Sequence, residues 1–218
     1  MTGLRQRQKA DRHRRLMDAA LQLFREKGYG AVRTEDIAAL AEVSVGTLYN
    51  YFETKGDLLL ALVTLEVEEI LGQGAAVVAS PPGDIASAFD LLIGTYYDHS
   101  LTYLTKPLWR TAMALTISDP GTPFSLRYTA HDRSLAGQVT ALVAQLQRRG
   151  LARTDVSAAA IGEMLFGALN QLFTEFVKDE SMSLAALKAQ VAAQNAALAG
   201  LLAPSHLDSG ATDRLPKA

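Results

Sequence analysis

The 218-residue sequence contains no cysteine. This absence excludes a disulfide scaffold, a cysteine-ligated zinc site, an iron–sulfur cluster and a catalytic thiol. Long apolar runs are also missing, since the longest are short stretches such as LLLALVTL, and these cannot cross a bilayer. The basic N-terminus is not followed by the apolar segment that a secretory signal needs. We therefore expect a cytoplasmic protein without a membrane partner.

Motifs of known enzyme classes are absent as well. The sequence holds no GxSxG, no HExxH, no phosphate-binding P-loop and no GxGxxG. The histidines are widely spaced, and none has an acidic partner at the spacing that metal ligands require. We expect no catalytic residue, no metal site and no cofactor. An all-helical enzyme is the least favoured of the functions considered.

Charge is unevenly distributed along the chain. The net charge of −2 argues by itself against binding to nucleic acid. Residues 1–15, however, hold six basic side chains against one acidic side chain, whereas residues 61–218 carry a net charge of −4. A solvated basic tail and an arm that attracts DNA phosphates both fit this asymmetry.

Helical periodicity extends through almost the whole chain, and no segment alternates with period two. Two proline- and glycine-containing segments, SPPGD and SDPGTP, break the pattern. The sequence therefore predicts an all-α fold of about nine helices. The expected helices span about 16–27, 34–42, 45–52, 54–71, 84–104, 107–118, 124–149, 157–178 and 183–203. The expected parts are 1–57 with a basic arm and three short helices, a larger helical domain over 58–203, and a flexible tail over 204–218.

The three short helices form a helix-turn-helix pattern in which AEVS joins the second to the third. Ser44 is the predicted N-cap of the third helix, whose outer face presents Gly46, Thr47 and Asn50. Threonine and asparagine suit base edges in the major groove, and Lys55 at the start of the fourth helix suits a phosphate. Many helical proteins contain two short helices joined by a tight turn and do not bind DNA, so the spacing alone leaves DNA binding open.

The segment AALQLFREKGYGAVRTEDIAALAEVSVGTLYNYFETKGDLLLAL resembles the N-terminal DNA-binding domain of the TetR family of bacterial transcriptional regulators, over about residues 12–63. The resemblance implies a repressor that binds a palindromic operator as a homodimer and is released by a small molecule held in the C-terminal domain. One position departs from the family pattern. Glu42 stands in the turn where the family usually has glycine, and it must accept an unusual backbone conformation or a modified turn.

The resemblance also implies DNA contacts at the front of the second helix, along the third, and at the start of the fourth. Thr34 would cap the second helix and touch phosphate, and Glu35 would set base preference or cap the helix. Tyr49 and Tyr51 match positions that usually contact phosphate. The full set implied is Arg33, Thr34, Glu35, Ser44, Val45, Gly46, Thr47, Tyr49, Asn50, Tyr51 and Lys55.

A symmetric operator requires two recognition helices about 34 Å apart, and hence a dimer. The helix expected over 157–178 is apolar on more than one face, and the alanine-rich segment 183–203 allows close helix approach. Either a second copy of the chain or the remaining helices of the same chain cover these faces. The predicted interface residues are Leu165, Leu169, Leu172, Phe173, Phe176 and Val191.

Aromatic side chains cluster between residues 89 and 128, with a few polar groups among them. This mixture suits a small apolar or aromatic effector with one or two polar anchors, and a plain core is the competing interpretation for each residue. Arg110 would hold a carboxylate or remain on the surface. A dimeric helical scaffold and an activator without ligand release are the alternative functions. The candidate ligand residues are Phe89, Tyr96, His99, Tyr103, Trp109, Arg110, Met113, Tyr128, Phe166 and Asn170.

Overall fold

The computed structural model describes residues 2–204, and all the regular structure in this part of the chain is helical. The all-α prediction is therefore confirmed. None of these helices combines the length and apolarity needed to span a membrane. The helices are α1 (Thr2–Lys27), α2 (Thr34–Leu40), α3 (Val45–Tyr49), α4 (Lys55–Ala79), α5 (Ile85–His99), α6 (Lys106–Ser118), α7 (Pro123–Arg148), α8 (Ala158–Lys178) and α9 (Leu184–Leu202).

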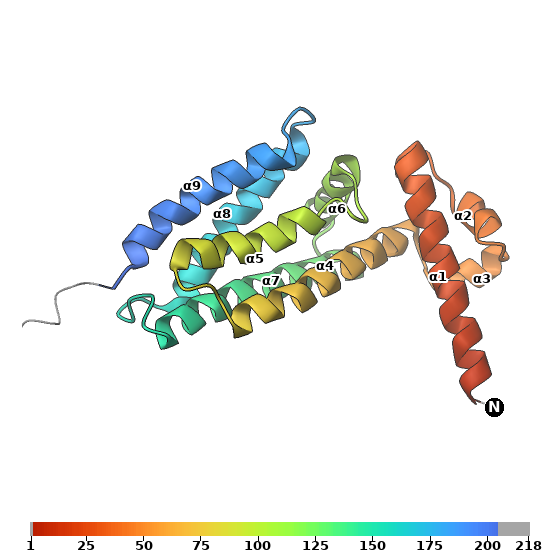
Figure 1. Ribbon diagram of the computed structural model, residues 1–218. Coiled ribbons are helices and arrows are strands. Elements are labelled where there is room, and N and C mark those ends of the chain that lie inside the picture. The colour runs from red at the N-terminus through yellow and green to blue at the C-terminus, as the bar shows by residue number, and fades with distance from the viewer. Residues whose placement is uncertain (1, 205–218) are drawn as a thin grey trace, which may run out of the picture.

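The first three helices form a separate unit at one end of the molecule (Figure 1). Helix α1 packs against α2, and α2 packs against α3, around a small apolar core. Leu16, Phe24, Ile37 and Leu48 are almost fully buried in it. Helix α4 contacts α1 and continues into the second unit, so that it joins the two.

The second unit is a bundle of α4 to α9. Helix α7 packs against both α4 and α8, while α5 packs against α4 and α9. Helices α7 and α8 approach closely at Gly162 of α8, where a Cβ atom added to the glycine would lie 2.6 Å from the Cα atom of Thr140 on α7. No side chain larger than hydrogen fits there without a backbone shift, so the α7–α8 packing depends on this glycine.

Several helix ends differ from the predictions. Helix α1 begins at Thr2, so the basic segment is part of a long helix and not a tail. Helix α3 ends at Tyr49 because the chain turns at Asn50, and α5 ends at His99. The predicted tail lies outside the described residues from 205 onward.

Helix α4, which was expected to run to about residue 71 or beyond, continues through Gly72 and Gly74 to Ala79. Gly74 is buried, and a Cβ atom there would clash with the side chains of Gln138 and Leu92. The glycine thus lets α5 and α7 approach α4. Tertiary packing of this face outweighs the low helix propensity of glycine.

Candidate DNA-binding surface and effector cavity

Helix α3 has only five residues and is held by its cap and by one buried side chain. The Ser44 hydroxyl accepts a hydrogen bond from the Thr47 amide at 3.1 Å and pairs with the Thr47 hydroxyl at 2.8 Å. Leu48 is fully buried beneath the helix. Gly46 and Asn50 are exposed, whereas Val45 and Thr47 are half-buried. The predicted cap is confirmed, and it presents the polar side of α3 to solvent.

Tyr49 links the end of α3 to the start of α2. Its side chain is 48% exposed, and its hydroxyl lies 3.2 Å from the Thr34 hydroxyl. Thr34 was expected to cap α2 but is instead its first residue, because Arg33 occupies the cap position and its amide donates to the Asp36 carboxylate at 3.3 Å. The two hydroxyls therefore lie side by side at the surface, and the one that accepts from the other keeps its own proton for a phosphate.

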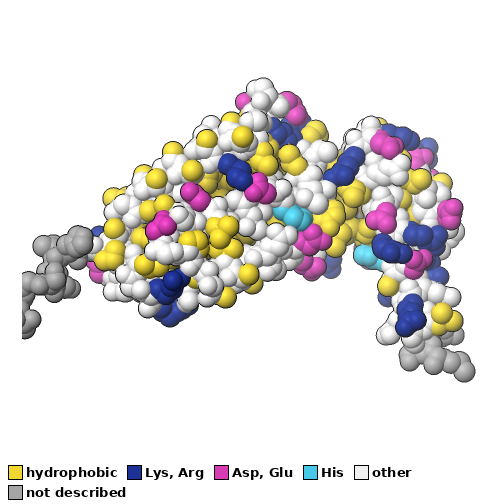
Figure 2. Space-filling view, viewed as in Figure 1, with side chains coloured by type: hydrophobic (Ala, Val, Ile, Leu, Met, Phe, Trp, Pro, Cys, Tyr) yellow, Lys and Arg dark blue, Asp and Glu magenta, His cyan; other side chains and the backbone are white. Residues whose placement is uncertain are grey.

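Arg33 and Glu35 are exposed and form an ion pair with an N–O distance of 3.4 Å. An exposed pair of this kind contributes little to stability. The guanidinium is therefore available to exchange this partner for a phosphate when DNA approaches. Several Lys and Arg side chains lie over the α1–α3 end of the molecule (Figure 2).

The side chains of Tyr51 and Lys55 form hydrogen bonds within the N-terminal unit. The Tyr51 hydroxyl donates to the Lys9 carbonyl at 3.2 Å and accepts from the Arg12 guanidinium at 3.3 Å, so it is fixed against α1. The Lys55 amine donates to the carbonyls of Tyr29 and Val32, at 2.7 and 3.0 Å. Burial lowers the pKa of Lys55. A phosphate contact by either side chain requires it to leave some of these partners, and that role remains a prediction.

The turn between α2 and α3 contains Glu42 with φ of 53°, in the left-handed region. It is the one non-glycine residue with positive φ in the described range. The strained conformation expected from the missing glycine is therefore confirmed. The Glu42 carboxylate lies 3.7 Å from the Arg15 guanidinium of α1, so the exposed side chain also faces the basic helix.

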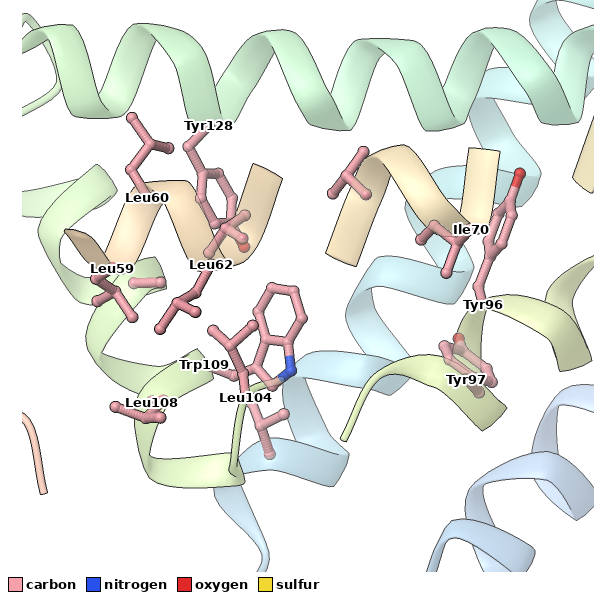
Figure 3. Close-up of a cluster of buried hydrophobic side chains, with 14 of the residues drawn as sticks. Leu59, Leu60, Leu62, Ile70, Tyr96, Tyr97, Leu104, Leu108, Trp109 and Tyr128 are labelled. Atoms are coloured by element: carbon pink, nitrogen blue, oxygen red, sulfur yellow. The ribbon is translucent and has the colours of Figure 1, made fainter. Parts of the chain in front are cut away.

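The helical bundle contains an aromatic cavity between α4, α5, α6, α7 and α8. The cavity has a volume of about 80 Å³, or about 670 Å³ when the open solvent around its mouth is counted. Figure 3 shows Trp109 and Tyr128 at one end of the buried cluster and Ile70, Tyr96 and Tyr97 at the other. The predicted ligand residues that line the cavity are Tyr96, Trp109, Tyr128, Phe166 and Asn170.

The other five predicted ligand residues do not line the cavity. Phe89 is fully buried in the core, and Met113 is half-buried against it. His99 lies between two carboxylates, and Tyr103 donates to one of them, Glu69, at 2.6 Å. Arg110 donates to the Val177 carbonyl and forms an ion pair with Glu180 at 2.7 Å, so it joins α6 to the end of α8.

The sequence-based prediction missed two acidic residues in the cavity wall, Glu66 and Asp132. Glu66 follows Leu62 by four residues and Val63 by three, so its place on the apolar stripe of α4 was a visible signal. Its side chain is 1% exposed. Burial raises the pKa of Glu66, and it raises that of Asp132 to about 6. Acidic groups, not Arg110, therefore set the charge of the cavity.

The predicted dimer residues lie mostly inside the protomer. Leu165, Leu169, Phe176 and Val191 are buried by neighbouring helices, and Leu172 is half-buried against the same core. Phe173 lines the cavity, stacked on Tyr97 with ring centroids 5.8 Å apart. The predicted α8 residues lie on the apolar side of this amphipathic helix, and neighbouring helices of the same protomer cover that side. The exposed apolar residues of α8 and α9, which we name the α8–α9 face, are Ala160, Met164, Ala168, Ala193, Ala197 and Leu201.

The fold and the capped α3 together define a helix-turn-helix protein with a separate helical bundle. Residues 16–62 match the family model described as bacterial regulatory proteins, tetR family. The N-terminal unit thus matches the DNA-binding part of the TetR family of bacterial transcriptional regulators.

Two curated relatives share the N-terminal part. The HTH-type transcriptional repressor KstR of Rhodococcus jostii is 41% identical over 73 residues, which are 34% of this chain and 32% of the relative. The fatty acid metabolism regulator protein of Bacillus subtilis is 31% identical over 107 residues, 46% of this chain and 54% of the relative. The chain thus matches about a third to a half of the length of these relatives.

Solved structures support the whole fold. A TetR-family transcriptional regulator from Streptomyces coelicolor superimposes with a TM-score of 0.67 at 21% identity, covering 88% of this chain and 96% of that chain. Thermus thermophilus FadR, a TetR-family repressor solved with lauroyl-CoA, gives a TM-score of 0.63 at 19% identity, covering 94% of this chain and 97% of that chain.

Proposed function

We propose that the protein is a sequence-specific DNA-binding transcriptional repressor that acts as a homodimer and is released by a small-molecule effector. The observation that carries the proposal is the capped helix α3, which presents Gly46, Thr47 and Asn50 beside the paired hydroxyls of Thr34 and Tyr49. Base-reading and phosphate-binding groups thus lie together on one surface. The mechanism involves no catalysis and no cofactor, and a cytoplasmic location stays a prediction.

In this proposal, different residues of the N-terminal unit contact the bases and the phosphate backbone of DNA. Thr47 and Asn50 face outward from α3 toward base edges, while Thr34, Tyr49 and Arg33 lie at the rim of the same surface, toward the backbone. The basic residues of α1 add an attraction that does not depend on sequence and weakens with salt. An activator would use the same surface, but the similarity to the KstR repressor favours repression.

Homodimerisation through the α8–α9 face supplies the second recognition helix. The face is built from small side chains that allow close approach of helices. Met164 and Leu201, which are 70% and 72% exposed, add two large apolar side chains to these small ones, and contiguous exposed apolar surface marks interaction sites. Apolar side chains along the α9 edge of the bundle are visible in Figure 2. A dimeric scaffold that does not bind DNA would share this face but would not need the exposed polar side of α3.

The aromatic cavity is the proposed effector site. FadR of Thermus thermophilus was solved with lauroyl-CoA, but a similarity at 19% identity concerns the fold and does not identify an effector for this chain. An effector weakens DNA binding when it binds more tightly to the protein conformation whose recognition helices do not fit the operator. The structure must therefore connect the cavity with α1.

The loop after α5 supplies that connection. The Trp109 indole in the cavity donates to the Ser100 carbonyl at 2.6 Å. One residue further on, the Arg25 guanidinium of α1 donates to the Leu101 carbonyl at 3.5 Å and also to the Thr102 carbonyl. A ligand that moves Trp109 thus displaces the carbonyls that hold α1, and the angle of the DNA-binding unit changes with them.

Arg25→Gln is expected to weaken the link between effector and DNA while leaving the cavity intact. The effector should still bind, but the ratio of DNA affinities without and with effector should fall by about fivefold or more. Fluorescence anisotropy of labelled operator, titrated at several effector concentrations, measures this ratio. Lys27→Gln, which removes one positive charge from the same end of α1, is the control. An unchanged ratio in Arg25→Gln excludes this route.

Selection from a pool of random double-stranded DNA tests the proposed function. The protein is expected to enrich a palindrome whose half-sites are centred about one helical turn, or a multiple of it, apart. Affinity for the selected site should exceed that for scrambled DNA by about a thousandfold at the same salt concentration. Recovery of unrelated sequences without a palindrome would contradict the proposal.

A further inference from the structure

The cavity contains one buried acidic oxygen whose hydrogen-bonding capacity is not used. Glu66 projects from α4 into the cavity wall with its side chain 1% exposed. Its Oε1 atom lies 2.7 Å from Nδ1 of His99, but Oε2 is buried and has no hydrogen-bond partner within residues 2–204. A buried carboxylate oxygen without a donor is costly, and such atoms are rare in folded proteins.

Four other polar side chains of the wall already form hydrogen bonds within the protein. The Tyr96 hydroxyl donates to Gln138 at 2.6 Å, and the Tyr97 hydroxyl donates to the Leu169 carbonyl at 2.9 Å. The Trp109 indole donates to Ser100, and His131 pairs with the Thr64 hydroxyl at 2.9 Å. Among the described residues of the wall, Oε2 of Glu66 is the fully buried side-chain atom that lacks a hydrogen-bond partner, and it requires a donor.

The charges around the cavity add to this demand. His99 lies between Glu66 and Glu69, with a nitrogen–oxygen distance of 2.8 Å to the latter, so both ring nitrogens face carboxylate oxygens, which favours the charged imidazolium form. Burial disfavours this charge, but the hydrogen bonds to the two carboxylates outweigh it and raise the pKa of His99. Of the two carboxylates only Glu66 belongs to the cavity wall, because Glu69 is 44% exposed and lies outside it. Asp132 adds another carboxylate to the wall, and neither lysine nor arginine lines the cavity.

The remaining wall is aromatic, and its geometry suits a cation with an apolar body. Trp109 meets Phe173 edge to face with centroids 5.3 Å apart, and Phe173 stacks on Tyr97. Tyr128 and Phe166 also line this space. Aromatic faces attract ammonium groups, and their area binds apolar carbon. A carboxylate or phosphate ligand would instead meet Glu66 and Asp132 without a compensating cation.

The geometry points to a protonated primary or secondary amine with an aromatic body as the effector of this cavity. Its ammonium group donates to Oε2 of Glu66 and lies near Asp132, and its ring packs among Trp109, Tyr128 and Phe166. This assignment names the chemical class of the effector. One part of it, the release of DNA by the bound amine, rests on the proposed function. Binding of the amine itself is a separate claim.

Three probes of equal length test the assignment: phenylbutylamine, phenylbutanol and phenylbutyrate. Titration of the full-length protein is followed by the fluorescence of Trp109, the single tryptophan of the chain. The amine is expected to bind about tenfold or more tightly than the alcohol, and the carboxylate more weakly than both. Equal affinities, or a preference for the carboxylate, would overturn the assignment.

Glu66→Gln keeps the size of the side chain and removes its charge. In this variant the preference for the amine over the alcohol should fall by about tenfold, whereas affinity for the alcohol should change by less than about twofold. Glu69→Gln makes the same chemical change one helical turn along α4, outside the cavity wall, and should keep the preference. Asp132→Asn provides a second test should Glu66→Gln fail to fold, with a smaller loss expected. Retention of the full amine preference in a folded Glu66→Gln variant contradicts the proposal.

The same proteins are assayed for binding to the selected operator, so the two claims fail separately. Loss of the amine preference with DNA binding intact removes the effector assignment and leaves the repressor. Amine binding in a protein that selects no DNA site removes the repressor and leaves the amine site. Amine binding without any change in operator affinity overturns its role as the effector.

Discussion

Met164→Glu is expected to convert the dimer into monomers and to weaken operator binding by about a hundredfold or more. In a twofold interface each substitution appears twice, so two unpaired carboxylates are buried against an apolar partner surface. Sedimentation velocity at micromolar concentration measures the first effect, and anisotropy with a palindromic site measures the second. Monomers bind only one half-site, and the affinity gained by linking two half-sites is lost.

Ile117→Glu is the matched control for this substitution. Ile117 is 79% exposed at the end of α6, so a carboxylate there remains in water and the dimer should persist. Phe173→Glu is not a suitable test, because Phe173 lines the aromatic cavity and the charge would disturb that site instead. A Met164→Glu protein that remains dimeric with unchanged affinity would exclude the α8–α9 face as the interface.

Gly162→Ala is expected to lower the free energy of unfolding by about 1–3 kcal/mol. The added methyl group meets the backbone of Thr140 at 2.6 Å and also the Thr140 side chain, so α7 and α8 must move apart. Urea unfolding followed by circular dichroism gives the midpoint and the slope. Gly72→Ala on α4 is the control, because a Cβ atom there meets nothing within 4 Å and alanine should stabilise the helix by about 1 kcal/mol. If Gly162→Ala is as stable as the parent protein, α7 and α8 can separate at Thr140 without a cost in free energy, and the prediction is wrong.

The helices could be read from the sequence because their apolar residues recur with helical spacing and their caps are explicit. Ser44 caps α3, and Leu48 lies beneath it, both as predicted. The extent of α4 could not be predicted, because Gly74 is tolerated only through its contact with α5 and α7. Local propensity alone does not contain that information.

The candidate site was predictable to a different degree in its two parts. The predicted DNA-binding residues belong to a short continuous segment, so spacing and resemblance were enough to predict that they share one surface. The cavity is assembled from five helices, and periodicity shows which residues are apolar without showing whether they meet a cavity, the core or a second chain. Phe173 was assigned to the dimer for this reason. Glu66 was not predicted because a glutamate on a helix is usually exposed, whereas the predicted polar anchor, Arg110, is tied to Glu180 in the structure.

The exposed side of α3 is the central claim, and Thr47→Ala tests it most directly. Its affinity for the selected palindrome is measured across a series of salt concentrations, beside Tyr49→Phe and the surface control Thr154→Ala. We predict that Thr47→Ala lowers specific affinity by about tenfold with an unchanged salt slope, and that Tyr49→Phe weakens binding to all sequences alike. Thr154→Ala should behave as the parent protein. Unchanged, salt-dependent binding in both Thr47→Ala and Tyr49→Phe would contradict the assignment of α3 as the recognition helix.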